Sequence, residues 1–295
     1  MIRLVVLGSG GSLPSVRHVP SSFAVKYGAT YLFDCCEGCQ RQMMKYGANY
    51  GQLEAVFLSH LHADHFLGVF GLVQTLGMIG RRSELLITGP VGTKKMMDAV
   101  FSLKELAPPF PLVFKDVRDG VVLEERLFSV RAFPVRHGCK ALGYALEEGE
   151  KTRFDEAKAK AKGLRGPMFT EIQEKGKLAI GGKTVRLEDI TYKQDGKKIV
   201  YSGDTAPCAE LLAAAKNADL LIHDACFTEA DGAQAKERLH STAKEAAECA
   251  KKAGAKKLLL THASNRYEDR SPLLKEAKAV FRETLMAEEG LEVLV

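Results

Sequence analysis

The string His60-Leu61-His62-Ala63-Asp64-His65 places four side chains that can bind a metal ion within six residues. The chain has eight histidines, and three of them fall in this string. It follows the apolar run 55–58, which predicts a buried strand, so we expect the string to form a loop. A single helix would not gather these side chains, because positions i, i+2 and i+5 do not share one helical face. Imidazole and carboxylate ligands suit zinc, with manganese or iron as alternatives.

Three further apolar runs, 198–201, 219–222 and 257–260, also end at polar or ionisable residues. Strands of α/β sheets carry their ligands and chemistry at their C-terminal ends, so we expect all four runs to deliver side chains to one edge. Helical patterns and further strands surround these runs. The expected helices are 37–46, 66–79, 94–101, 209–215, 241–253 and 272–288, and the expected strands fill 1–33, 121–135 and 140–147. The pattern predicts an α/β fold, a two-layered sheet sandwich with helices on both outer faces.

Three of the residues at the ends of apolar runs extend the metal-binding set beyond the first string. They are His137, Asp204 and His262. Two metal ions need roughly eight to ten contacts from protein and solvent, and a carboxylate such as Asp204 can bridge both ions. We therefore predict a two-metal centre from seven side chains: His60, His62, Asp64, His65, His137, Asp204 and His262.

Length and composition exclude several other classes of protein. A chain of 295 residues forms two domains or one large α/β unit, and 46% hydrophobic with 27% charged residues excludes disorder, collagen and coiled coil as the main state. No apolar run reaches the roughly 18 residues of a membrane span. The seven cysteines give no even disulfide framework, so we expect a cytoplasmic protein. The cluster Cys35, Cys36 and Cys39 lacks a second pair at zinc-finger spacing, which favours buried free thiols.

The positive charge lies in one stretch of the chain. Residues 151–198 hold 13 lysines and arginines against 7 aspartates and glutamates, and the remainder holds 29 against 30. Apolar residues are sparse there, which indicates an excursion from the core. A local basic patch is typical of a surface that binds a polyanion, although a solvated lysine face fits the composition equally well.

The motif His-x-His-x-Asp-His, followed by a distant His, an Asp and a last His, resembles the metallo-β-lactamase superfamily. The resemblance implies an αββα sandwich. It assigns His60, His62 and His137 to one metal and Asp64, His65 and His262 to the other, with Asp204 as the bridge. The cofactors it implies are two Zn²⁺ per subunit, with Mn²⁺ or Fe²⁺ possible in their place.

Other stretches resemble ribonuclease Z, the endonuclease family that removes 3′ trailers from precursor tRNA. They are Gly8–Pro14, Phe66–Gly68, Thr75–Gly77, Gly89-Pro90, Gly143-Tyr144, Phe154-Asp155, Ala157-Lys158, Gly166-Pro167 and His240–Thr242. The likeness covers nearly the whole chain and implies one domain, 1–295, with an inserted basic arm at 150–197. The implied partners are precursor tRNA and a second subunit in a homodimer. The RNA contacts expected from it are Arg17, Lys158, Lys160, Lys162, Arg165, Gly166 and Pro167.

The resemblance also implies a mechanism. Asp64 serves as ligand and proton acceptor, His240 as the general acid for the leaving 3′-oxygen, and Asp224 orients His240. The products are a tRNA 3′-OH and a trailer with a 5′-phosphate. The family usually has Glu at the position of Asp224, and the loop Pro14–His18 is shorter than the family's, which leaves the cleavage position relative to CCA open. Two alternatives remain: a hydrolase of the same fold for a small phosphodiester, sulfate ester or lactone, and a binding protein whose catalytic site has decayed.

Overall fold

The computed structural model describes all 295 residues as two compact units. The first unit comprises residues 1–147 and 197–295, and the second comprises residues 148–196. No helix in the chain is long and apolar enough to cross a membrane.

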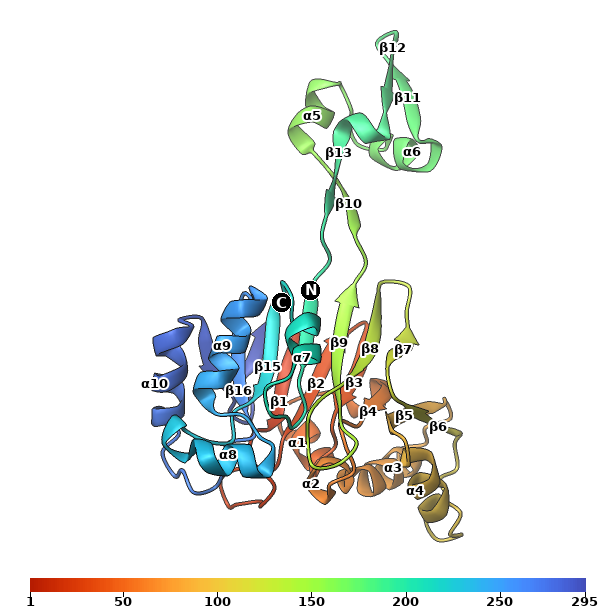
Figure 1. Cartoon of the computed structure of the whole chain (residues 1–295). Coiled ribbons are helices and arrows are strands. Elements are labelled where there is room, and N and C mark those ends of the chain that lie inside the picture. Colours follow the sequence, from red (N-terminus) through yellow and green to blue (C-terminus); the bar gives the residue numbers. More distant parts are fainter. The chain divides into compact units, whose positions relative to one another are not determined.

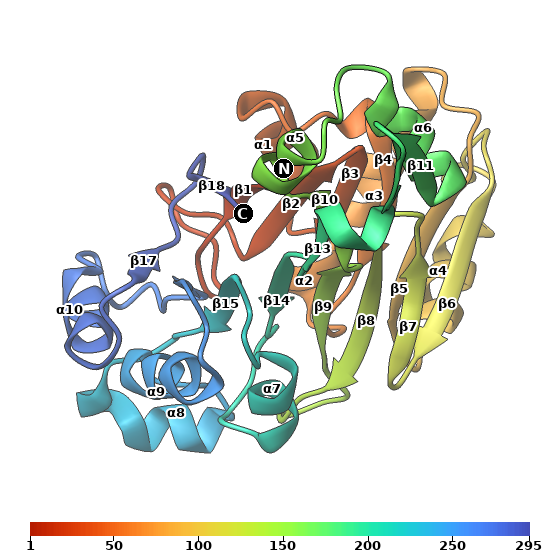
Figure 2. The same cartoon turned by 90° about the horizontal axis from the view of Figure 1, so that it is seen from above.

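The first unit contains two seven-stranded sheets packed face to face (Figures 1 and 2). The first sheet has the strand order β18-β1-β2-β3-β4-β5-β6. Its strands are β1 (Arg3–Gly8), β2 (Ser22–Tyr27), β3 (Ala29–Phe33), β4 (Leu53–Phe57), β5 (Leu85–Pro90), β6 (Leu112–Val117) and β18 (Glu292–Leu294). From β3 to β6 neighbouring strands run parallel, so their C-terminal ends share one edge.

The second sheet has the strand order β17-β16-β15-β14-β9-β8-β7. Its strands are β7 (Gly120–Glu124), β8 (Phe128–Pro134), β9 (Leu142–Glu148), β14 (Lys198–Tyr201), β15 (Leu220–Asp224), β16 (Leu258–Thr261) and β17 (Thr284–Met286). From β14 to β17 the neighbours run parallel. Large aromatic side chains fill the space between the sheets and make ring contacts across it: Phe23, Phe33, Phe57, Tyr144 and Tyr201.

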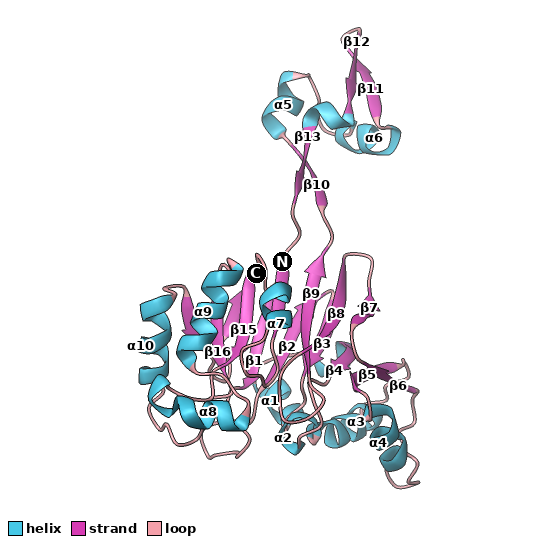
Figure 3. Ribbon diagram, in the orientation of Figure 1, coloured by secondary structure: helices cyan, strands magenta, loops and turns pink.

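Helices cover the outer face of each sheet, which confirms the predicted sandwich (Figure 3). The first sheet carries α1 (Cys39–Lys45), α3 (Gly68–Met78) and α4 (Thr93–Phe101). The second carries α7 (Ala209–Ala214), α9 (Ala243–Ala253) and α10 (Ser271–Val280). The alanines of α9 form its buried stripe, and Thr242 caps it with Glu245 in a reciprocal capping box. The short elements are η1 (Tyr50–Gln52), α2 (Ala63–Phe66), η3 (Glu229–Asp231) and α8 (Gly232–Arg238).

The predicted helix 272–288 was wrong over its second half. Helix α10 ends at Val280, and Phe281 leaves the helix with φ −138°. The chain then runs alongside β16 as the parallel edge strand β17, because backbone groups there complete the sheet. Helix α8 was not predicted, since Ala235 is its only buried residue and a single alanine leaves no apolar stripe in the sequence.

The second unit, residues 148–196, lies in the region of the predicted insert 150–197. It consists of β10 (Lys151–Phe154), α5 (Glu156–Ala161), α6 (Met168–Lys175), β11 (Lys177–Ile180), β12 (Lys183–Arg186), η2 (Leu187–Ile190) and β13 (Thr191–Gln194). Strand β10 pairs with β13, and β11 pairs with β12, both antiparallel. The unit has its own small core of Ala159, Leu164, Ile172, Val185 and Ile190.

Candidate metal centre

The string His60–His65 follows β4 at the parallel edge of the first sheet. Strand β4 ends at Phe57, and the one-turn helix α2 begins at Ala63 with His62 as its extended N-cap residue. The chain therefore turns sharply within the string, and its four ligating side chains converge as the sequence predicts, although Asp64 and His65 lie in α2 and not in a loop. His60 and His65 are fully buried, and His62 is exposed.

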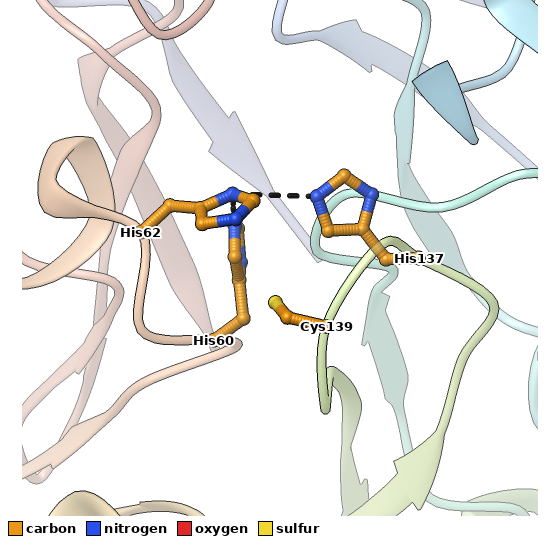
Figure 4. A group of neighbouring side chains, drawn as sticks. All are labelled: His60, His62, His137 and Cys139. Carbon is orange, nitrogen blue, oxygen red and sulfur yellow. Dashed lines mark hydrogen bonds between the residues drawn. The ribbon is translucent and has the colours of Figure 1, made fainter. Parts of the chain in front are cut away.

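One group of ligating atoms gathers around His60, His62 and His137. His60 Nε2 lies 2.9 Å from His62 Nδ1, and His62 Nδ1 lies 3.4 Å from His137 Nε2 (Figure 4). His137, which follows β8, lies with its Nδ1 3.1 Å from the Leu239 carbonyl oxygen. A proton on Nδ1 donated to that carbonyl leaves the Nε2 lone pair directed at the other two rings. Three imidazole nitrogens thus face one point.

A second group combines Asp64, His65, Asp204 and His262. His65 Nε2 lies 3.1 Å from Asp64 Oδ2 and 3.3 Å from Asp204 Oδ2. His262 Nε2 lies 3.2 Å from the same Asp204 oxygen, which is also 3.7 Å from His60 Nε2. Asp204 follows β14 and His262 follows β16, so the second sheet supplies both. Asp204 lies between the two groups, where a bridging carboxylate would have to be.

The residues of this centre fit a bound cation. Buried polar atoms in proteins almost always have hydrogen-bond partners. Five buried side-chain atoms of this chain have none, and four of them belong to the second group. They are Asp64 Oδ2, His65 Nε2, Asp204 Oδ1 and His262 Nε2. Because these atoms point at one another and their chemistry is that of zinc, manganese or iron ligands, a divalent cation satisfies them together.

The protonation tendencies of the centre agree with this fit. Burial lowers the pKa of His60 and of His262, which favours the neutral imidazole that binds metal. Burial also acts against the charged form of His65, but the carboxylates of Asp204 and Asp34 outweigh it and raise its pKa. The carboxylates that raise the pKa of His65 would equally attract a cation, which would take the place of its proton.

Asp34 is a residue of the centre that the sequence analysis missed. Its Oδ2 accepts hydrogen bonds from Ser59 Oγ (2.7 Å) and Tyr201 Oη (2.6 Å), and lies 2.7 Å from His65 Nδ1. Its Oδ1 accepts from the Ser59 N–H at 2.6 Å. Such a carboxylate fixes the tautomer and orientation of a ligating histidine. Asp34 ends the apolar run of β3, the same signal that was used for the other four runs.

His240 and Asp224 form a pair beside the second group. His240 Nδ1 lies 2.8 Å from Asp224 Oδ2, and its ring stacks on the His262 ring at a centroid distance of 5.2 Å. Asp224 is fully buried and also accepts from the backbone N–H groups of Thr205 and Cys226. Burial opposes the charged form of His240, yet the Asp224 carboxylate raises its pKa to about 9. His223 is buried on the other side of β15, with Nδ1 2.7 Å from the Asp224 carbonyl oxygen, and contributes nothing to the centre.

The residues predicted to contact RNA lie outside this centre. Arg17 is exposed in the loop 13–18, which is held by a 2.9 Å contact between His18 Nδ1 and Glu289. The others belong to the second unit, where Arg165, Gly166 and Pro167 form an exposed turn before α6. Three exposed lysines of α5 and its C-cap make surface ion pairs with acidic neighbours: Lys158 with Asp155, Lys160 with Glu156 and Lys162 with Asp189.

Comparison with known proteins places the chain in a family. Residues 29–154 and 184–263 match the beta-lactamase superfamily domain. Ribonuclease Z of Methanosarcina acetivorans is 42% identical over 99% of this chain and 98% of its own length. Ribonuclease Z of Myxococcus xanthus is 39% identical over 96% and 94%. The chain belongs to the ribonuclease Z family.

Solved structures agree with this membership of the ribonuclease Z family. The crystal structure of human tRNase Z, short form, superposes with a TM-score of 0.73 and 25% identity, covering 99% of this chain and 98% of that one. The metallo-β-lactamase fold protein YhfI of Bacillus subtilis gives a TM-score of 0.72 at 21% identity, which shows the fold alone. The predicted fold and the predicted family are both confirmed.

Proposed function

We propose that this member of the ribonuclease Z family is a metal-dependent endoribonuclease that removes 3′ trailers from precursor tRNA. The observation that carries the proposal is 42% identity to a ribonuclease Z along the whole chain, including residues 148–196. A hydrolase of the same fold for a small substrate would need the metal centre but not the second unit. The products we propose are a tRNA with a 3′-OH and a trailer with a 5′-phosphate.

We assign two metal ions, zinc by preference, to the two groups of ligands. His60, His62 and His137 would hold one ion, Asp64, His65 and His262 would hold the other, and Asp204 would serve both. When bound, the ions supply an acidic water near neutral pH and positive charge for the phosphate oxygens. The buried position of the ligands concentrates this charge, since electrostatic interactions are stronger away from water.

Proton transfer is the task of the chain's own side chains. Asp64 supplies a carboxylate at the centre that can accept the proton of the attacking water. His240 holds a proton near neutral pH because Asp224 raises its pKa to about 9, so it can protonate the leaving 3′-oxygen. A bound cation would lower this pKa toward the working range of an acid. Asp224 keeps the imidazole aimed by accepting its Nδ1 proton.

In this proposal the second unit binds the RNA. Its exposed lysines and Arg165 suit phosphate contacts, which position a nucleic acid without reading its sequence. The ion pairs that these lysines make are exposed and worth little, so phosphates can replace the acidic partners. We further propose that the protein is a cytoplasmic homodimer. Sedimentation of the purified protein tests whether it is a dimer.

The deciding experiment is cleavage of end-labelled precursor tRNA carrying a 3′ trailer. We expect a single cut at the acceptor end with the metal-loaded protein and none with Asp204→Ala. Asp219→Asn is the matched control, since Asp219 is a buried carboxylate that pairs with Lys197 and Lys256 instead of the centre. Intact RNA in the presence of wild-type protein with two bound ions would refute the proposal and favour a small phosphodiester as substrate.

A further inference from the structure

Cys139 lies beside the three imidazoles of the first group. Its Sγ and the ligating nitrogens of His60, His62 and His137 all lie within 4.8 Å of one another, and the side chain points toward these rings (Figure 4). The loop after β8 carries both His137 and Cys139. Neither the sequence motif nor the two-metal assignment above uses this thiol.

The thiol of Cys139 lies at the surface beside the metal-binding string. Cys139 is also the exposed cysteine of the chain, whereas the other six are buried or half-buried. Its side chain can therefore rotate without displacing the core.

We propose that Cys139 is a further protein ligand of the ion held by His60, His62 and His137, in addition to the shared Asp204. With zinc–nitrogen bonds of about 2.0 Å and zinc–sulfur bonds of about 2.3 Å, a nitrogen and a sulfur bound to one zinc ion lie at most about 4.3 Å apart. The imidazole nitrogens already lie 2.9 and 3.4 Å apart, and the sulfur lies within 4.8 Å of each of them, close to this limit. On coordination the sulfur–hydrogen bond breaks, a sulfur–metal bond forms, and the proton passes to solvent.

This ligand determines which metals the first site prefers. A thiolate is a soft ligand that selects zinc and similar ions, whereas carboxylate and water suit manganese and magnesium. The nitrogen–sulfur donor set therefore favours Zn²⁺, Co²⁺ and Cd²⁺ over Mn²⁺ at this site. The inference rests on the metal centre of the proposed function, but its test requires no RNA.

The test is the absorption spectrum of the protein loaded with Co²⁺. We expect visible bands from bound cobalt in the wild-type protein and in Cys139→Ala, and a near-ultraviolet sulfur-to-cobalt band in the wild-type protein only. Cys226→Ala is the matched control, because Cys226 lies within 4.8 Å of His240 and His262 and is the other thiol near the centre. It should keep the sulfur band. A sulfur band that survives in Cys139→Ala, or visible bands with no sulfur band in the wild-type protein, would overturn the assignment.

Alkylation gives a second readout. In the metal-free protein iodoacetamide should modify Cys139, the exposed thiol, and one equivalent or more of Zn²⁺ should slow this at least about tenfold, the effect of a thiol withdrawn into a metal bond. Cys208 serves as the internal reference in the same peptide map. Equal Cys139 rates with and without Zn²⁺ would contradict ligation. If neither Co²⁺ nor Zn²⁺ binds, both the ligand and the metal-dependent function fail, whereas metal binding without sulfur contact overturns the ligand alone.

Discussion

The substitution Asp34→Asn tests how the structure prepares His65 for metal binding. Asp34 Oδ2 lies close to three groups that can donate, including His65 Nδ1 at 2.7 Å, and Oδ1 accepts the Ser59 N–H. If the asparagine NH₂ replaces Oδ2, His65 Nδ1 must become an acceptor, and the ring proton moves to Nε2. The nitrogen that faces Asp64 and Asp204 then has no lone pair for a metal ion.

The opposite amide orientation is also unfavourable. It directs the NH₂ group at the Ser59 N–H, and an unpaired buried donor costs about 1–3 kcal/mol. Loss of such a supporting partner typically weakens metal affinity about 10–100-fold, or about 1.4–2.7 kcal/mol. We expect this loss at one of the two sites, because His60 contacts Ser59 rather than Asp34.

Competition with a zinc chelator measures the effect. Wild-type protein, Asp34→Asn and the control Asp219→Asn should be titrated together, with circular dichroism to verify folding. The expected result is one weakened Zn²⁺ site in Asp34→Asn and wild-type behaviour in Asp219→Asn. Unchanged affinity at both sites in a folded Asp34→Asn protein would refute the tautomer argument.

Four further outcomes follow from the structure. His240→Ala should keep its metal content but lose about 10²–10⁴-fold in kcat on precursor tRNA, and wild-type turnover would remove it from the mechanism. Asp224→Asn should move the alkaline limb of the kcat–pH profile to lower pH. A general acid loses its proton as the pH rises through its pKa, and the Asp224 carboxylate is what raises the pKa of His240. An alkaline limb that stays in place would contradict this role of Asp224. Deleting residues 152–190 should weaken tRNA binding and reduce the salt dependence of binding, while both metals stay bound. A deletion variant that binds precursor tRNA as tightly as the wild type would contradict this. Gly68→Ala should lower the free energy of unfolding by about 1–3 kcal/mol, and with it the melting temperature, because the new Cβ would lie 1.9 Å from a backbone carbonyl oxygen. Gly149→Ala is the control: its Cβ meets no atom within 4 Å, so this variant should melt as the wild type does.

Much of this architecture could be predicted because buried parallel strands leave a local signal. The apolar run 198–201 is a strand, and the runs 55–58, 219–222 and 257–260 each overlap one. Each run leads into polar residues near the centre. The dense string His60–His65 marked the centre by itself. These features depend on neighbours in sequence, which is why they could be predicted.

Other parts of the centre depend on contacts between distant segments. Asp34 approaches His65 only after β3 and β4 pair, and Cys139 approaches His60 only after the two sheets pack. Strand β17 exists because β16 offers it a free edge, while its sequence continues a helical pattern. Tertiary context decides such contacts: the apolar run of β3 marks Asp34 as a residue at a strand end, but no local pattern shows that it pairs with His65.

The distribution of the ligands over both sheets ties the supply of metal to the lifetime of the protein. The string His60–His65 belongs to the first sheet, and His137, Asp204 and His262 belong to the second, so an ion bound at either group joins the two. Ions that bind only the packed state stabilise it by mass action, by about 4.1 kcal/mol when the free ion is at 1,000 times its dissociation constant. Metal starvation would therefore act twice on this protein. It would stop the chemistry, and it would enlarge the unfolded fraction that proteases remove, so that the amount of the protein falls together with its activity.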